Sequence, residues 1–268
     1  MKSLSTITLT DVQAVYDGPE GDLWELIMGE QIHIGGFSSS MDLSEKAGIK
    51  PGTDGVDLCC CTGAGMRFLV RFRQVASMRG VDATENVIRR GRQRCEAGGF
   101  SGKIDFTLAL ATATGLNAGS ADFVWGEDAW CYVEDKAALI SEAARIVKPG
   151  GVIAFTDWIE GPGALTHAEA QRFMAFMKFP TLQDFGGYQN LLKANRCEIL
   201  MAQDTGRFAP YADLYLDVIR KQLTYDALRV IGFDMELMRA MGQEMEFMQA
   251  LAHAGKIAQG LFIAKKMQ

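Results

Sequence analysis

The feature that most constrains the fold is an alternation, between Gly55 and Trp158, of short apolar runs with longer mixed segments. We expect the apolar runs to be strands and the mixed segments to be helices, because this order is typical of β-α-β units around a parallel sheet. The expected strands of this part are residues 55–60, 77–82, 104–110, 121–125 and 151–158. The last of these runs is apolar almost throughout, as expected of a strand buried on both faces.

Helices are expected between these strands, from about Met66, from Thr84 to Ala97 and from Asp135 to Val147. Thr84 is the expected N-cap of the second helix. The helix-breaking sequence Lys-Pro-Gly-Gly at residues 148–151 is expected to end the third. Beyond Trp158 the sequence predicts helical segments over residues 160–205 and 207–256, with two further strands at residues 197–203 and 260–265. The fold class is therefore α/β, a doubly wound, mostly parallel seven-stranded sheet with a helical cap over its crevice.

Charge and hydropathy limit the kinds of partner that the chain is expected to bind. The 33 acidic and 27 basic side chains give a net charge of −6, which argues against nucleic-acid binding and favours a small-molecule partner. No apolar run approaches the roughly 18 residues that a membrane span needs, so no membrane partner is expected. The first nine residues lack a signal-peptide pattern, and we expect a cytoplasmic protein. The oligomeric state cannot be read from the sequence.

Eight arginines lie between Arg67 and Arg94, four of them on the second expected helix. An RNA-binding stripe is one interpretation, but these arginines have no aromatic residues between them, which favours a solvated helix face. Five methionines between Met235 and Met248 recur every three or four residues and predict one packed face of a helix rather than a ligand surface.

Three cysteines are consecutive, at positions 59–61. This spacing is neither that of a zinc knuckle nor that of a disulfide framework, so we expect reduced thiols; a thiol catalyst or metal site is the alternative. The three histidines, His33, His167 and His253, also lack metal-ligand spacing, and no metal is expected.

The end of the first expected strand carries the chemistry. Asp57 precedes a turn containing Gly63 and Gly65 and then a helix, an order that holds nucleoside-containing cofactors because the small residues let the backbone approach the ligand. Asp82 closes the second strand 25 residues later, where a carboxylate would bind ribose hydroxyls.

These residues resemble those of the class I S-adenosylmethionine-dependent methyltransferases. The matching segments are residues 56–65, residues 80–82 and residues 138–157, and residues 29–37 are similar to the segment that closes over the cofactor. Within this group the chain is most similar to the sarcosine/dimethylglycine and phosphoethanolamine N-methyltransferases. The resemblance implies a Rossmann-like methyltransferase fold in one domain, with N-terminal lid helices (1–50), a cofactor-binding core (51–158) and cap helices plus the last two strands (159–268).

The resemblance also implies the cofactor, S-adenosyl-L-methionine, and its binding residues. Asp57 and Gly63 would bind its methionine end, Asp82 with Ala83 its ribose, and Gly35 with Gly36 would lie near its carboxylate. Three positions that would contact the cofactor depart from the usual pattern: Cys59 and Cys61 replace glycines, and Thr112 replaces an acid near the adenine.

For the acceptor side, the resemblance assigns catalytic roles to Tyr16 and Asp128, with His33 as a third candidate that is equally well read as structural. The residues expected to contact the substrate are Trp130, Tyr132 and Trp158, as an aromatic cage that favours cationic ligands. Trp130 and Trp158 could equally be core residues.

The expected function is methyl transfer to a small-molecule acceptor, an amine or amino-acid-like nitrogen. Two alternatives stay open. One is a natural-product O- or C-methyltransferase, and the other is a non-catalytic binding protein on the same fold, which the departures at Cys59, Cys61 and Thr112 motivate.

Overall fold

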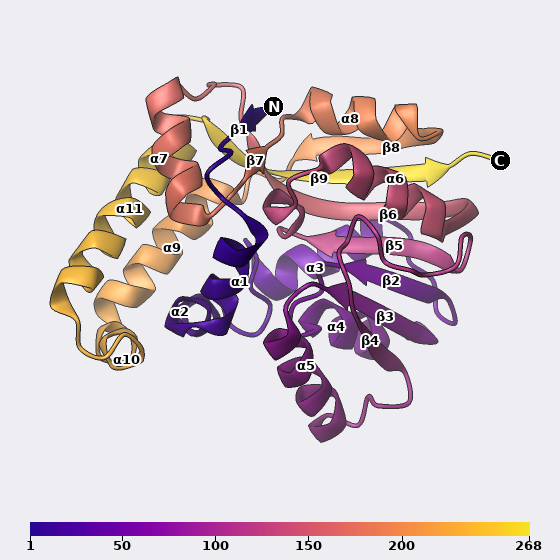
Figure 1. Cartoon of the computed structure of the whole chain (residues 1–268), viewed down its shortest axis with the longest axis horizontal. Helices are drawn as coiled ribbons and strands as arrows, with labels where there is room; N and C mark the ends of the chain where they lie inside the picture. The colour runs from indigo at the N-terminus through magenta and orange to yellow at the C-terminus, as the bar shows by residue number, and fades with distance from the viewer.

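The structure, a computed structural model, describes residues 1–268 and is built around a seven-stranded sheet (Figure 1). The strand order is β4-β3-β2-β5-β6-β9-β8. The strands are β2 (Asp54–Leu58), β3 (Ser77–Asp82), β4 (Ile104–Leu108), β5 (Ala121–Glu127), β6 (Val147–Glu160), β8 (Cys197–Asp204) and β9 (Ile257–Lys266). Only β9 is antiparallel to its neighbours, β6 and β8. The predicted α/β class and mostly parallel seven-stranded sheet are confirmed.

Most strand boundaries differ from the prediction by up to four residues; the first expected strand, for example, ends at Leu58 and not at residue 60, and two further differences have a clear structural reason. The third strand ends at Leu108 because the chain turns back on itself directly afterwards, with Leu110 bridged to Ala113. The breaker at residues 148–151 does end the preceding helix at Ile146, but β6 starts at once at Val147 and runs through the breaker, with a register shift in its pairing to β5.

Helices cover both faces of the sheet. One face carries α3 (Gly36–Lys46), α4 (Ala64–Phe72) and α5 (Glu85–Ala97), and the opposite face carries α6 (Lys136–Ile146) and α8 (Phe185–Ala194). Two apolar cores fill these layers, one including Leu43, Leu69 and Ile88 and the other including Ile140 and Leu192. Because α3 packs on the sheet, only α1 and α2 of the first 50 residues remain to form a cover.

A third apolar core lies outside the sheet layers. It joins α1 (Leu9–Asp17) and α2 (Pro19–Met28) to the cap, which consists of α7 (His167–Met177), α9 (Phe208–Lys221), α10 (Thr224–Val230) and α11 (Met235–His253). Figure 1 shows α1 and α2 between this cap and the sheet. The short strands β1 (Lys2–Ser3) and β7 (Thr181–Leu182) pair and fix the N-terminus beside the cap.

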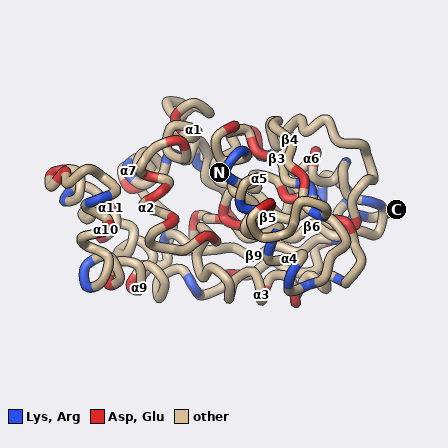
Figure 2. Tube along the Cα trace, turned by 90° about the horizontal axis from the view of Figure 1, so that it is seen from below, with Lys and Arg blue, Asp and Glu red and all other residues tan.

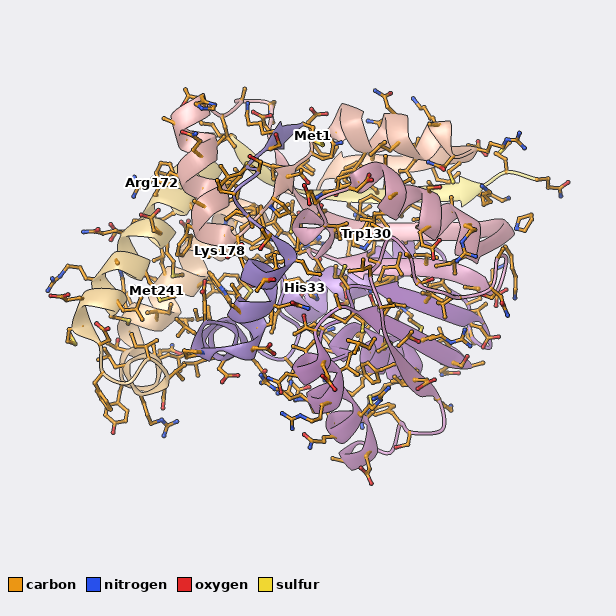
Figure 3. The ribbon with its side chains drawn as sticks, viewed as in Figure 1. Met1, His33, Trp130, Arg172, Lys178 and Met241 are labelled. Carbon is orange, nitrogen blue, oxygen red and sulfur yellow. The ribbon has the colours of Figure 1, made fainter.

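The predicted methionine face lies on α11. Met245 and Met248 are buried in the third core, and Met241, labelled in Figure 3, packs against it, whereas Met235 at the start of the helix is 58% exposed. Packing is therefore confirmed for the C-terminal part of this face only. None of the helices combines the length and apolarity that crossing a bilayer requires.

Of the four arginines of α5, Arg89 and Arg92 are exposed as expected, whereas Arg90 and Arg94 are only about a quarter exposed. Arg90 forms ion pairs with Asp22 and Glu25 of α2, and Arg94 pairs with the same Glu25 at 2.6 Å. Figure 2 shows acidic and basic positions intermixed along the trace. The sequence could not show this pairing, because the acids come from a helix about 65 residues away in the chain.

Candidate active site

The turn after β2 keeps a glycine-like backbone although cysteines occupy it. Cys59 has a φ of +63° and Cys61 a φ of +47°, and Gly63, the N-cap of α4, has a φ of +73°. These values lie in the left-handed region of backbone conformation, which residues other than glycine rarely adopt. The backbone N–H groups of Cys59 and Cys60 donate to the carbonyl oxygen of Val81, so the turn is anchored on β3.

Asp82 joins this turn to the start of α5. Its two carboxylate oxygens accept hydrogen bonds from the backbone N–H of Cys61 and of Thr84, both at 2.9 Å. Burial raises the pKa of the Asp82 carboxyl above its ordinary value. The next residue, Ala83, accepts a hydrogen bond on its carbonyl oxygen from the Gln13 side chain of α1, at 2.8 Å. The covering helix is thus tied to the carboxyl end of β3.

A cavity of about 300 Å³ opens beside this turn. It is lined by residues from the N-terminal segment, from the ends of β2, β3 and β5, and from the loop after β4. Seven of the residues predicted to bind cofactor or acceptor line it together: Tyr16, Cys59, Cys61, Asp82, Ala83, Thr112 and Tyr132.

A smaller cavity, of about 60 Å³, adjoins the first and shares Tyr16, Cys59, Cys61 and Ala129 with it. The predicted residues Asp57, His33 and Asp128 line this second cavity. Ten of the predicted site residues therefore line two adjoining cavities beside the carboxyl ends of β2, β3 and β5.

The second cavity contains two carboxylates close to the start of α4. A Cβ atom placed on Gly65 would lie 3.0 Å from Glu127 Oε2 and 3.5 Å from Asp57 Oδ2, so a larger residue there would require the Glu127 carboxylate to shift. Burial, together with the nearby Glu127 and Asp82, raises the pKa of Asp57 well above its ordinary value. The sequence reasoning missed Glu127, although it stands beside Asp128 at the end of an expected strand.

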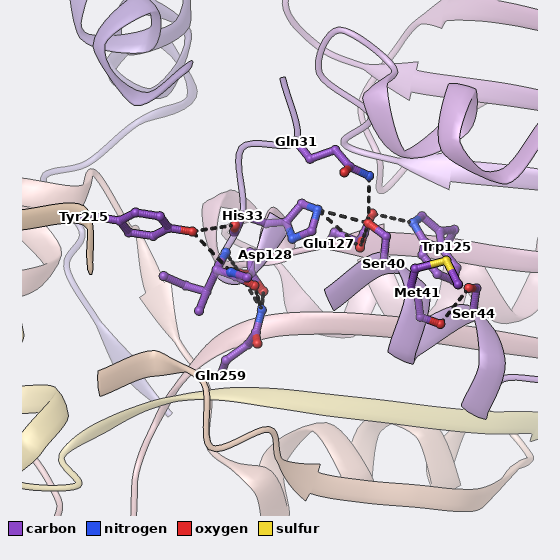
Figure 4. Close-up of polar contacts among 12 residues, drawn as sticks. Gln31, His33, Ser40, Met41, Ser44, Trp125, Glu127, Asp128, Tyr215 and Gln259 are labelled. Carbon is purple, nitrogen blue, oxygen red and sulfur yellow. Dashed lines mark hydrogen bonds and ion pairs between the residues drawn. The ribbon is translucent and has the colours of Figure 1, made fainter. Parts of the chain in front are cut away.

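Glu127 organises a hydrogen-bond network around His33 (Figure 4). Its carboxylate accepts hydrogen bonds from Ser40 Oγ at 2.8 Å and from Trp125 Nε1 at 3.1 Å. His33 Nε2 lies 3.4 Å from Glu127 Oε1 and 3.3 Å from Ser40 Oγ. The other ring nitrogen, Nδ1, is buried and has no hydrogen-bond partner. A buried polar atom without a partner is costly, so the site is arranged for a ligand that supplies one.

Asp128 links the covering segment to the sheet. Its carboxylate accepts hydrogen bonds from the backbone N–H of Ile34 and from the Gln259 side chain of β9, each at 2.8 Å. Burial raises the pKa of Asp128, and the nearby His33 acts in the opposite direction. Beside it, the N–H of Gly35 donates to the Tyr215 hydroxyl at 3.2 Å. Gly35 and Gly36 line neither of the two cavities, so their contact with a cofactor carboxylate stays a prediction.

Two tyrosines meet in the larger cavity. The rings of Tyr16 and Tyr132 lie edge to face with centroids 5.7 Å apart. Burial raises the pKa of both hydroxyls, and each hydroxyl contributes to the shift of the other. Both phenols therefore stay protonated near neutral pH.

Trp130 and Trp158 are core residues, and the expected cage contacts from them are wrong in this structure. Trp130, labelled in Figure 3, is fully buried, stacks on Phe155 and donates its indole N–H to the Leu58 carbonyl. Trp158 packs against Phe208 and other aromatic residues of the cap core and lines neither cavity. Trp130 follows the end of β5 and Trp158 lies inside β6 near its end, and the side chains of both turn into the packed layers.

Comparison with known proteins agrees with this arrangement. Residues 56–155 match the family described as "Methyltransferase domain". Phosphoethanolamine N-methyltransferase 1 of Arabidopsis thaliana is 25% identical over 201 residues, which are 74% of this chain but only 40% of that relative. The chain thus spans less than half the length of this curated relative.

Solved structures show the same fold. A candidate sarcosine dimethylglycine methyltransferase from Galdieria sulphuraria superposes with a TM-score of 0.83 at 21% identity, covering 96% of this chain and 98% of that one. Phosphoethanolamine N-methyltransferase 2 of Haemonchus contortus, in complex with phosphomonomethylethanolamine and S-adenosylhomocysteine, gives a TM-score of 0.86 at 18% identity, covering 98% and 61%. The chain therefore contains a segment that matches the methyltransferase-domain family, and it shares its overall fold with solved methyltransferases.

Proposed function

We propose that the protein transfers a methyl group from S-adenosylmethionine to a small-molecule acceptor, at an amine nitrogen. The observation that carries this proposal is the meeting of two sets of residues. The ends of β2 and β3 bring the expected cofactor-binding positions to the same cavity as the Tyr16–Tyr132 pair of the expected acceptor side.

The residues present fit the cofactor. The cysteines that replace glycines do not close the turn, since Cys59 and Cys61 hold the left-handed backbone and their side chains line the cavities. Asp82 would hold the ribose, Thr112 would lie at the adenine, and Asp57 would lie at the methionine end. The unpartnered His33 Nδ1 would meet a polar group of that same end. When bound, S-adenosylmethionine supplies a methyl group on a positively charged sulfur.

The task of the protein is then alignment and exclusion of water, because the transfer needs no covalent enzyme intermediate. The raised pKa values of Tyr16 and Tyr132 keep both hydroxyls protonated, so they orient the acceptor by hydrogen bonds and do not act as phenolate bases. Asp128, which lines the adjoining cavity, is the carboxylate proposed to take the proton that an ammonium group must lose before its nitrogen can react.

The two alternatives make different demands on the site. O- or C-methylation needs an acceptor whose nucleophile is an oxygen or carbon, and an acceptor panel separates it from N-methylation. A binding protein without turnover would take up the cofactor and consume none of it. The strained, left-handed backbone at Cys59 and Cys61 is the observation that favours the binding protein without turnover.

Calorimetry tests the proposal first, by titration of the protein with S-adenosylmethionine and with S-adenosylhomocysteine. Micromolar binding of both is expected, and no heat at millimolar ligand would contradict the proposal. S-Adenosylhomocysteine release is then measured over a panel of amines, phenols and thiols. Release of S-adenosylhomocysteine that depends on an amine supports N-methylation. Release that occurs with phenols alone supports an O-methyltransferase, and cofactor binding without any release supports a binding protein.

A further inference from the structure

We infer that the acceptor is a lipophilic amine that carries no anionic group. This inference rests on the proposed function and narrows it. Both the charge and the apolarity of the two adjoining cavities point to it.

Charge is the first observation. Neither cavity has a lysine or an arginine in its lining. Carboxylates, by contrast, line both of them: Asp82, Glu134 and Asp135 in the larger and Glu30, Asp57, Glu127 and Asp128 in the smaller. Asp57 and Asp82 are assigned to the cofactor, and Glu30 is paired with Arg67 at 2.6 Å. A phosphate or carboxylate on the acceptor would therefore face the remaining acids, Glu134 and Asp135 in the larger cavity and Glu127 and Asp128 in the smaller, with no lysine or arginine in either lining.

The cations near the site are already committed to other partners. Lys136 is buried, and its ammonium donates to the Thr181 hydroxyl at 2.6 Å and to the carbonyl oxygens of Cys131 and Val133. Burial lowers the pKa of Lys136. Arg90 and Arg94 are ion-paired with acids of α2. An anionic acceptor could recruit none of them without breaking these contacts.

Apolarity is the second observation. Beyond the positions assigned to the cofactor, the larger cavity is lined by Ile7, Leu9, Val12, Val133 and Pro180 as well as the two tyrosines, which suits an apolar ligand body. Leu9 and Leu110 are 45% and 48% exposed and yet line the cavity, so they lie where it reaches the surface. Exposed leucines at an entrance favour a lipophilic acceptor over a small zwitterion.

The same charges favour nitrogen over phenolic oxygen. An amine reacts as a neutral molecule: its lone pair forms the new bond to the methyl carbon, the carbon–sulfur electron pair stays on sulfur, and the positive charge moves to nitrogen. The carboxylates stabilise that positive charge before and after transfer. A phenol must first become an anion, which the same carboxylates destabilise. The product leaves as an ammonium ion, and the single proton released overall is the one that Asp128 takes from the incoming ammonium and passes to solvent.

Matched pairs of probes test the inference on the intact protein. The protein saturated with S-adenosylhomocysteine is titrated with 2-phenylethylamine and with phenylalanine, which differs by one added carboxylate, and then with tryptamine and tryptophan. Release of S-adenosylhomocysteine is measured for the same probes with S-adenosylmethionine. The amine of each pair is expected to bind at least about tenfold more tightly and to turn over faster, because the added anion faces only carboxylates.

Equal or tighter binding of the amino acids overturns the inference, and so does the absence of binding by both amines. Failure of the proposed function is seen separately, as a protein that does not bind S-adenosylmethionine at all. In addition, 4-ethylphenol is compared with 2-phenylethylamine, and faster methylation of the phenol overturns the preference for nitrogen.

One pair of variants checks the electrostatic argument. Glu134→Lys places a cation at an exposed position of the cavity lining. Glu198→Lys makes the same change of charge on β8, an edge strand that three strands separate from β2. At low ionic strength, Glu134→Lys is expected to reduce the preference for the amine over the amino acid by about threefold, and Glu198→Lys to leave it unchanged. An equal effect of the two substitutions overturns the argument from local charge.

Discussion

Cys61 combines a left-handed backbone with a side chain that is exposed to both cavities. The Cys61 N–H is held by Asp82, which fixes the conformation whatever the side chain. Burial and the Asp82 charge raise the pKa of the thiol to about 12, so Cys61 is not a thiolate near neutral pH. The thiol is therefore no nucleophile here, and its position matters through shape and strain.

Replacement of Cys61 by glycine and by alanine separates strain from side-chain loss. A left-handed residue with a Cβ costs roughly 1–2 kcal/mol, whereas alanine gains about 0.4–1 kcal/mol over glycine from a less flexible unfolded chain. Cys61→Gly is therefore expected to be more stable than Cys61→Ala by about 0.5–1 kcal/mol, as measured by urea unfolding. A more stable alanine variant would show that the turn relaxes out of the left-handed region.

Asp82 is the residue on which cofactor binding should depend most. In the unsubstituted protein the Asp82 carboxylate accepts hydrogen bonds from two backbone N–H groups. Asp82→Asn removes the negative charge and turns an amide N–H₂ group toward one of these donors. We expect S-adenosylmethionine to bind about 10–100-fold more weakly, the range for losing a hydrogen bond to a charged group. Asp105→Asn, near the opposite end of the neighbouring strand β4, serves as the control and should bind normally. Unchanged affinity of the Asp82 variant would place the ribose elsewhere.

Much of the site could be predicted at the residue scale because strand ends in a parallel sheet share one edge. Asp57, Asp82 and Asp128 could be placed by that rule alone. The side chains of Trp130 and Trp158 could not, because their direction depends on Phe155 and Phe208, which come from other parts of the chain. Glu127 was missed because its role depends on contacts with Ser40, Trp125 and His33, which the sequence does not show.

At the scale of elements, two acids of α2, Asp22 and Glu25, pair with arginines of α5, and Glu25 is the acid that both arginines share. Glu25 pairs with both Arg90 and Arg94, and all three side chains are about a fifth to a quarter exposed. The strands and helices of the sheet could be predicted from hydrophobic periodicity. This contact could not, because it depends on how two distant helices meet.

Glu25→Ala leaves both arginines short of a partner and should loosen α1 and α2 without unfolding the sheet. Hydrogen exchange over residues 9–28 is expected to become roughly three- to tenfold faster, while overall stability falls by less than about 1 kcal/mol, as for partly exposed ion pairs. Glu45→Ala, which breaks the single pair with Arg73, is the matched control. Unchanged exchange in α1 and α2 would mean that the apolar core alone holds them.

At the scale of the whole molecule, the carboxyl edge of the sheet concentrates buried acids. Burial raises the pKa of Asp57, Asp82, Asp128 and Asp157, the last to about 6. An acid whose folded pKa lies above its unfolded value stabilises the fold fully below the unfolded pKa, and this stability is lost as the pH rises through the folded pKa. The site therefore opposes folding near neutral pH, and a bound cation relieves that opposition.

Asp157 gives the clearest pH test. It is fully buried, and its pKa rises from 3.8 to about 6, so its contribution to stability falls by at most about 3 kcal/mol between about pH 4 and pH 7. Urea unfolding of Asp157→Asn should show a smaller loss of stability over this interval than the unsubstituted protein. Asp122 is the opposite case, because its hydrogen bonds to the Asp54 N–H and Lys148 outweigh burial and lower its pKa. The unsubstituted protein loses the stability that Asp122 contributes as the pH falls, and Asp122→Asn should remove that loss. Identical pH profiles for Asp157→Asn and the unsubstituted protein would contradict the assignment.

The measurement that tests the central claim most directly is isotope transfer. The protein is incubated with S-adenosylmethionine that carries a trideuterated methyl group and with 2-phenylethylamine, and the amine is analysed by mass spectrometry beside the Asp82→Asn variant. The account predicts an amine in which one trideuteromethyl group has replaced one hydrogen on nitrogen, formed much more slowly by the variant. An unlabelled amine, recovered from a protein that has bound its cofactor, would contradict it.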